Sequence, residues 1–115
     1  MTTETKRHGE FVAFEVAIQT IEAMREVVAL VRRKDVELAK QMVRAASSVA
    51  ANVAEGNRRV GKDRLHLFRI ATGSADEVIA HLRVAQAWGY VEPRQVAQAV
   101  KLADRELRLL SGLTR

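Results

Sequence analysis

The chain has 115 residues and is 48% hydrophobic and 29% charged, with a single proline and a formal net charge of +5. This length suits one domain, and the apolar runs are too short to cross a membrane. Because the chain has no cysteine, a disulfide scaffold, thiolate metal ligation and a catalytic thiol are excluded.

A polar leader and a long helix are the first predicted elements. Residues 1–9 are mostly charged or small, so we expect a flexible leader before a single domain that spans residues 10–115. From Glu10 to Arg33, apolar residues recur at helical spacing and therefore share one face. These residues are Phe14, Ile18, Ile21, Val28 and Val31.

The second predicted helix runs from Asp35 to Glu55 and has a face of small residues. Asp35 is suited to begin it, and Gly56 to end it as a C-terminal cap. Since the side chains on this face are short, a neighbouring backbone must approach closely to fill the space. The face consists of Val36, Ala39, Val43, Ala46, Ala50 and Val53.

A connector over residues 56–61 leads into a third predicted helix, from Lys62 to Trp88. Gly73 interrupts it and allows two interpretations, a break capped by Ser74 or a continuous helix with a close crossing at the glycine. We favour continuity, because the apolar pattern keeps its phase through Gly73, and we expect Trp88 to plug the core at the helix end. The pattern is Phe68, Ala71, Ala75, Val78, Leu82 and Ala85.

The fourth predicted helix runs from Pro93 to Leu110 after a turn at Gly89. Four amphipathic helices with short connectors predict an all-α fold, an antiparallel up-down-up-down four-helix bundle. The alanine-rich second helix and second apolar stripes on the first and last helices leave more apolar surface than one bundle can hide, which predicts self-association. The stripe on the last helix contains Ala99, Leu102, Leu109 and Leu113.

Positive charge is concentrated between residues 58 and 69, where Asp63 is the only acid. Such a cluster attracts phosphate backbones, although solvated helix ends also carry basic residues. The candidate nucleic-acid-binding residues are Arg58, Arg59, Lys62, Arg64 and Arg69. An antiparallel bundle would gather them at one pole with Lys6, Arg7 and Arg115. The opposite pole would carry Arg32, Arg33, Lys34 and Arg94.

Motifs between Leu38 and Val91 carry a resemblance to a known family. They are Arg44-Ala45-Ala46-Ser47-Ser48-Val49, Asn52-Val53-Ala54-Glu55-Gly56 followed by Arg59, Phe68-Arg69-Ile70-Ala71-Thr72-Gly73-Ser74, and Gly89-Tyr90-Val91. In them the chain resembles the four-helix-bundle proteins encoded in intervening sequences of bacterial 23S ribosomal RNA genes. That family is distantly related to the accessory protein of diversity-generating retroelements.

The resemblance implies a homopentameric ring of four-helix bundles around a central channel. It also implies binding of nucleic acid or of a reverse transcriptase, as in the retroelement relatives. Gly61 departs from the family, which more often has serine there, and this weakens any argument for a hydroxyl cap or phosphate contact at that position.

Within these motifs we expect a structural role for Asn52, Glu55 and Gly56, with Glu55 paired to Arg59 across the connector. The functional alternative is that the guanidinium groups of Arg58 and Arg59 bind phosphate. Gly73 and Ser74 are interpreted as a close-packing notch, which completes the structural motif Asn52, Glu55, Gly56, Gly73 and Ser74.

Enzyme and metal chemistry have weak support in the sequence. No Glu-x-x-His motif occurs, so we expect no metal and no cofactor. Arg59 and His66 fit the loose Arg-x4–6-His spacing of HEPN-type ribonucleases, in which histidine is the acid or base. Three arginines close to one histidine make a chance match easy.

The sequence therefore predicts a non-enzymatic oligomeric scaffold or accessory protein. No apolar signal segment opens the chain, so we expect a cytoplasmic location without a membrane partner. Expected partners are copies of the chain itself, most simply as a homopentamer, and RNA, DNA or a reverse transcriptase. A purely structural oligomer without ligand, or a HEPN-like ribonuclease that uses Arg59 and His66, are the alternatives.

Overall fold

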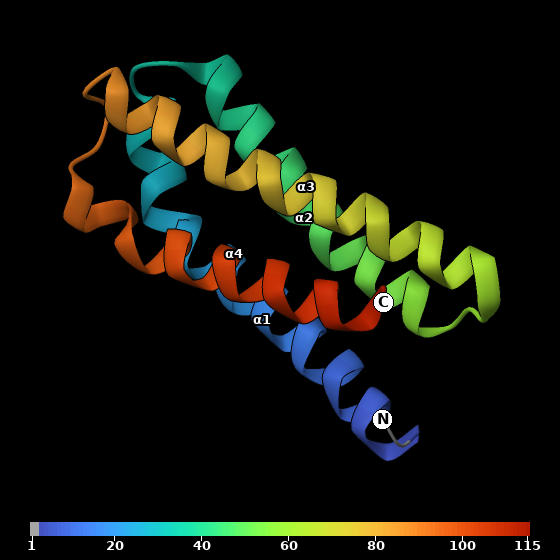
Figure 1. Ribbon diagram of the computed structural model, residues 1–115. Coiled ribbons are helices and arrows are strands. Elements are labelled where there is room, and N and C mark those ends of the chain that lie inside the picture. Colours follow the sequence, from blue (N-terminus) through green and yellow to red (C-terminus); the bar gives the residue numbers. More distant parts are fainter. Residues whose placement is uncertain (1–2) are drawn as a thin grey trace.

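The computed structural model describes residues 3–115, with side chains from His8 onward, and this part of the chain forms four α-helices and no strand. The prediction of an all-α fold with four helices is confirmed. Each helix packs mainly against two others: α1 and α3 both contact α2 and α4 (Figure 1). The helices are α1 (Thr3–Arg32), α2 (Val36–Asn57), α3 (Gly61–Ala87) and α4 (Pro93–Leu113).

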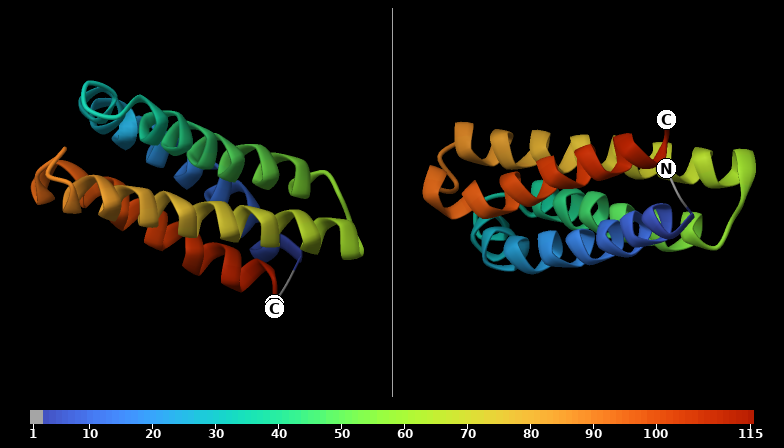
Figure 2. Two further views of the ribbon diagram at one scale, coloured as in Figure 1. Left: turned by 90° about the horizontal axis from the view of Figure 1, so that it is seen from above. Right: turned by 60° about the horizontal axis from the view of Figure 1, so that its bottom comes forward.

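The helices form an elongated molecule of 46 × 22 × 18 Å. The connector between α2 and α3 lies at the end where α1 begins and α4 finishes, and the other two connectors lie together at the opposite end (Figure 2). We call the first of these the connector end. None of the helices is both long enough and apolar enough to span a membrane, within the residues described.

The first and last helices, α1 and α4, are both longer than predicted. The leader over residues 1–9 is helical from Thr3, and residues 1–2 lie outside the described range. Residues 3–9 contain no proline, and the single glycine among them weakens a helix by only about 1 kcal/mol. A Cβ at Gly9 would lie 3.4 Å from Leu113 Cδ2, so the start of α1 lies against the end of α4.

The apolar faces of all four helices meet in one core. Ala99 and Leu102 are buried in it, and Leu109 and Leu113 pack against it. The second stripe of α4 is therefore covered within a single chain, and the prediction that it forms surplus surface was wrong. The two sides of that helix contact α1 and α3, so one wide apolar face serves two neighbours.

Gly56 does not cap α2, contrary to prediction. It is buried inside the helix, and a Cβ there would lie 2.6 Å from Phe68 Cε1 and 2.8 Å from Phe68 Cδ1. The missing side chain lets the largest buried ring of the core lie directly against the α2 backbone. The helix continues to Asn57, and Arg58 is its C-cap in right-handed conformation.

Helix α3 continues through Gly73, as predicted, but no helix of the described chain packs closely against the glycine. It is exposed, and no atom of the described chain lies within 4 Å of the position that a Cβ would take. Ser74 caps no helix either. It is buried, and its hydroxyl group forms a hydrogen bond with the hydroxyl group of Ser48.

Gly73→Ala is expected to raise the unfolding free energy by about 0.5–1 kcal/mol, because alanine favours the helix interior and meets no neighbour within the described chain. Urea denaturation at protein concentrations that keep the assembly state fixed measures this change. A loss of stability would show that another surface lies against the glycine.

The turn between α3 and α4 contradicts the prediction for Trp88. Trp88 is 70% exposed and stacks on Tyr90, with ring centroids 6.5 Å apart, so it is not a core plug. The reason is that α3 ends at Ala87 and Gly89 turns the chain with φ of 78°.

Asp35 caps α2 as expected: its Oδ1 accepts the Leu38 N–H at 3.0 Å, and its Oδ2 accepts the Tyr90 hydroxyl at 3.3 Å.

Candidate nucleic-acid interface

Three of the five predicted phosphate-binding residues point into solvent at the connector end. Arg58 follows α2, while Lys62 and Arg69 lie seven residues apart on α3 and therefore on one face. All three side chains are exposed, and none forms an ion pair with the acidic side chains described from His8 to Arg115. The side chains of Lys6 and Arg7, predicted to share this pole, lie outside those described.

Arg59 lies beside these residues but is partly neutralised. Its Nη2 donates to Glu55 Oε1 at 2.5 Å, so the pair expected from the sequence is present. The hydrogen bond to Glu55 raises the pKa of the Arg59 guanidinium above its ordinary value. This pairing closes the α2–α3 connector and leaves Arg59 less available for phosphate than Arg58.

Arg64 is a structural residue rather than a surface cation. It is only 20% exposed, and its guanidinium donates to Glu10 Oε1 and, at 3.3 Å, to the Gly56 carbonyl oxygen. The same group lies 4.6 Å from the centre of the Phe68 ring, within cation–π range. Arg64 thus links α1, α2 and α3, which corrects its assignment as an exposed contact.

The motif residues Asn52 and Ser74 meet through Ser48. Asn52 Nδ2 donates to the Ser48 carbonyl oxygen at 2.8 Å and to Ser48 Oγ at 3.0 Å, and Ser48 Oγ lies 2.8 Å from Ser74 Oγ. This chain of hydrogen bonds joins α2 to α3 midway along the bundle. Ser48 was not among the predicted site residues, although its position one turn before Asn52 places both on one face of α2.

The same serines line a polar groove of about 430 Å³ between α2 and α3. His81 and Glu77 stand on its α3 side, with Nε2 and Oε2 4.0 Å apart, and Arg44 stands on its α2 side. Arg44 was not among the predicted site residues. Because Arg44 is exposed, it gives the α2 side of the groove a positive charge that solvent can reach.

The residues of the ribonuclease alternative, Arg59 and His66, are not joined in the structure. Among the described residues, no group of three or more His, Asp or Glu side chains is placed to hold a metal. His66 is exposed on α3, and no hydrogen bond in this part of the chain joins it to Arg59, which is held by Glu55. Gly73, the remaining motif residue, faces open space.

Comparison with known proteins places the chain in a family. The model of the family "23S rRNA-intervening sequence protein" matches residues 10–112. A crystal structure of a protein of unknown function from the S23 ribosomal protein family of Bacteroides thetaiotaomicron has the same fold, with a TM-score of 0.78 at 19% identity, over 92% of this chain and 97% of that one. No curated protein matches the chain. The match over nearly the whole chain, together with the four-helix fold, shows that this protein belongs to the 23S rRNA-intervening sequence protein family.

Proposed function

We propose that the protein is a non-enzymatic, self-associating bundle that binds RNA through the cations of its connector end. The observation that carries the proposal is the exposed group Arg58, Lys62 and Arg69, which forms no ion pair with the described acidic side chains. In this proposal the helices form an antiparallel up-down-up-down bundle, and five bundles assemble as a ring in the cytoplasm.

The chemistry of the connector end favours a phosphate backbone as the ligand. Exposed guanidinium and ammonium groups displace counterions from phosphates, and this supplies affinity without reading sequence. The aromatic side chains Trp88 and Tyr90 lie on the turn at the opposite end of α3, so stacking on bases has no support near these cations. The family is named for the intervening sequences of 23S rRNA, and RNA is therefore the first phosphate polymer to test.

Replacing Arg58, Lys62 and Arg69 by alanine is expected to weaken binding of single-stranded RNA and to flatten its salt dependence. Loss of three phosphate contacts reduces the slope of log K against log salt by about 2. Fluorescence anisotropy over a salt series measures both quantities.

The matched control replaces Arg25, Arg83 and Lys101, which are also exposed and lie away from the connector, and it is expected to bind RNA like the wild type. Equal loss in both triple variants would mean that net charge alone governs binding. Unchanged binding after the connector substitutions would leave a purely structural oligomer as the better account.

Self-association is supported by the outer face of α3. Ile70 and Val84 are exposed large apolar residues, and their spacing of fourteen residues places them on one side of the helix. Trp88, which directly follows the last residue of α3, is exposed as well. A second copy of the chain would remove this surface from water. The support therefore comes from α3 and not from the α4 stripe.

Val84→Glu is expected to shift the protein from an oligomer toward the monomer, because it places a charge on this apolar face. A pentamer has five times the mass of the 12.8 kDa chain. The control Val36→Glu places the same charge on an exposed valine of α2 and is expected to leave the mass unchanged. Sedimentation equilibrium gives both masses. A wild-type protein that stays monomeric would contradict self-association.

The ribonuclease alternative has less support than binding. Arg59 donates to Glu55, so it would have to leave this partner before it could stabilise a phosphate transition state. A nuclease assay that compares the wild type with His66→Ala decides the matter. Cleavage that depends on His66 would replace the non-enzymatic proposal.

A further inference from the structure

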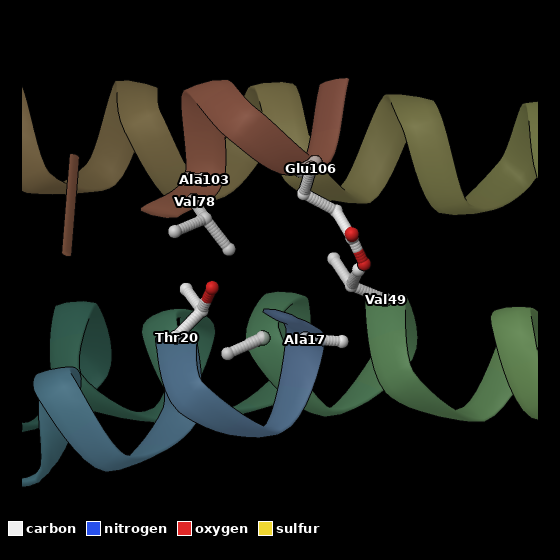
Figure 3. Close-up of a pocket in the computed structure, with 8 residues that line it drawn as sticks. Ala17, Thr20, Val49, Val78, Ala103 and Glu106 are labelled. Atoms are coloured by element: carbon white, nitrogen blue, oxygen red, sulfur yellow. The ribbon is translucent and has the colours of Figure 1, made fainter. Parts of the chain in front are cut away.

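Glu106 is a carboxyl group in the middle of the core. It lies on the buried face of α4 and is 1% exposed, and neither Oε1 nor Oε2 has a hydrogen-bond partner in the described part of the chain. An unpaired buried carboxylate is strongly destabilising, so the charged form does not suit this position. Figure 3 shows its side chain extending from α4 across the core toward Val49.

A small cavity of about 10 Å³ lies beside this carboxyl group, and all four helices line it. Its size corresponds to about one water molecule. Thr20 supplies the other polar group, on α1: its hydroxyl donates to the Val16 carbonyl oxygen at 2.7 Å, so its oxygen remains free to accept (Figure 3). The rest of the lining consists of alanines and valines.

Among the described side chains, none that lines the cavity opposite Glu106 carries a charge. The lining residues of α1, α2 and α3 are Ala17, Thr20, Ala46, Val49, Ala75 and Val78, none of which titrates, and Ala103 is its lining neighbour on α4. Burial raises the pKa of Glu106 to about 8, and the charge of Arg105 opposes this only in part. The environment therefore favours the neutral acid at neutral pH.

We propose that Glu106 is a neutral carboxylic acid in the closed bundle, that it binds one buried water molecule together with Thr20, and that loss of its proton releases α4. The water accepts from the Glu106 O–H and donates to Thr20 Oγ1. When the proton passes to solvent, the carboxylate needs more water than this cavity holds. Separation of α4 from α1 and α3, its two packing partners, supplies that water.

Infrared spectroscopy tests the protonation state through the carbonyl stretch of a protonated carboxyl group. At about pH 7 the wild type is expected to show this band and Glu106→Gln to lack it. The control Asp104→Asn removes an exposed carboxyl group of the same helix and is expected to retain the band. A band that is absent from the wild type, or present in Glu106→Gln, would overturn the neutral acid.

NMR magnetisation transfer from long-lived water to the backbone amides of Thr20 and Glu106 tests the water site. We expect transfer in the wild type and its loss in Glu106→Leu, which has no O–H to donate. A wild-type protein without such transfer has no bound water at this site.

Hydrogen–deuterium exchange tests the release of α4, with each rate divided by the intrinsic base-catalysed rate. Protection of the α4 amides is expected to fall about tenfold per pH unit between about pH 5 and 8, since opening then releases one proton. Glu106→Gln is expected to keep this protection, and Asp104→Asn to lose it like the wild type. At each pH the α4 amides are expected to be less protected than those of α2. Equal protection in α4 and α2 would show that the whole bundle opens, and pH-independent protection of α4 in the wild type would show that ionisation opens nothing. Either result overturns the proposal.

Discussion

The unfolding free energy of the wild-type protein will fall by several kcal/mol as the pH rises from about 5 to 8. Glu106 has its ordinary value of 4.5 in the unfolded chain and a pKa of about 8 in the bundle, so folding takes up a proton. The contribution of Glu106 to stability is therefore complete below about pH 4.5 and is lost as the pH approaches 8. The loss is about 1.4 kcal/mol per pH unit, roughly 4 kcal/mol over this range.

Glu106→Leu is expected to remove this pH dependence and to stabilise the protein by about 1–4 kcal/mol at pH 8, because an apolar side chain suits the surrounding alanines and valines. Urea unfolding followed by circular dichroism at several pH values measures both effects, and Asp104→Asn serves as the surface control. An identical slope in wild type and Glu106→Leu would mean that other groups govern the pH response.

Phe68→Ala is expected to lower the unfolding free energy by about 3–5 kcal/mol. Phe68 is fully buried and is the largest such side chain, and its ring contacts the Gly56 backbone on α2 and the Arg64 guanidinium on α3. Truncation leaves a cavity at the point where three helices are joined. Chemical denaturation measures the loss.

Gly56→Ala is the complementary change on the other side of this contact. Alanine favours a helix by about 1 kcal/mol over glycine, yet its Cβ would meet the ring at 2.6 Å, so we expect a net loss of about 1–3 kcal/mol. The effect should shrink in a Phe68→Leu background, which a double-mutant cycle measures. Gly73→Ala is the matched control in open space. Equal effects of the two glycine substitutions would contradict the proposed contact.

The sequence is sufficient to predict the helices but not their distant contacts. Spacing of apolar residues gives four helices, and Asp35 marks the start of α2 because a cap acts within one turn. Gly56 follows an apolar pattern and so resembles a cap, whereas its buried position depends on Phe68 twelve residues later. Trp88 is hydrophobic but lies beyond the end of α3, where only the turn geometry determines its exposure.

The candidate site was predictable only in part. The connector charges are visible in the sequence, but the pairing of Arg64 with Glu10 spans 54 residues and needs the fold. Glu106 had a detectable signal, since it stands between Ala103 and Leu110 at steps of three and four, on the apolar stripe of α4. A carboxyl group at such a position predicts a buried acid.

The most direct test of the proposed function is sedimentation velocity of labelled single-stranded RNA mixed with the wild-type protein. At low salt we expect the RNA to sediment with a protein species much larger than the 12.8 kDa chain, and to separate from it as the salt concentration rises. RNA that sediments alone at low salt, beside a monomeric protein, would contradict both the RNA binding and the assembly proposed for this bundle.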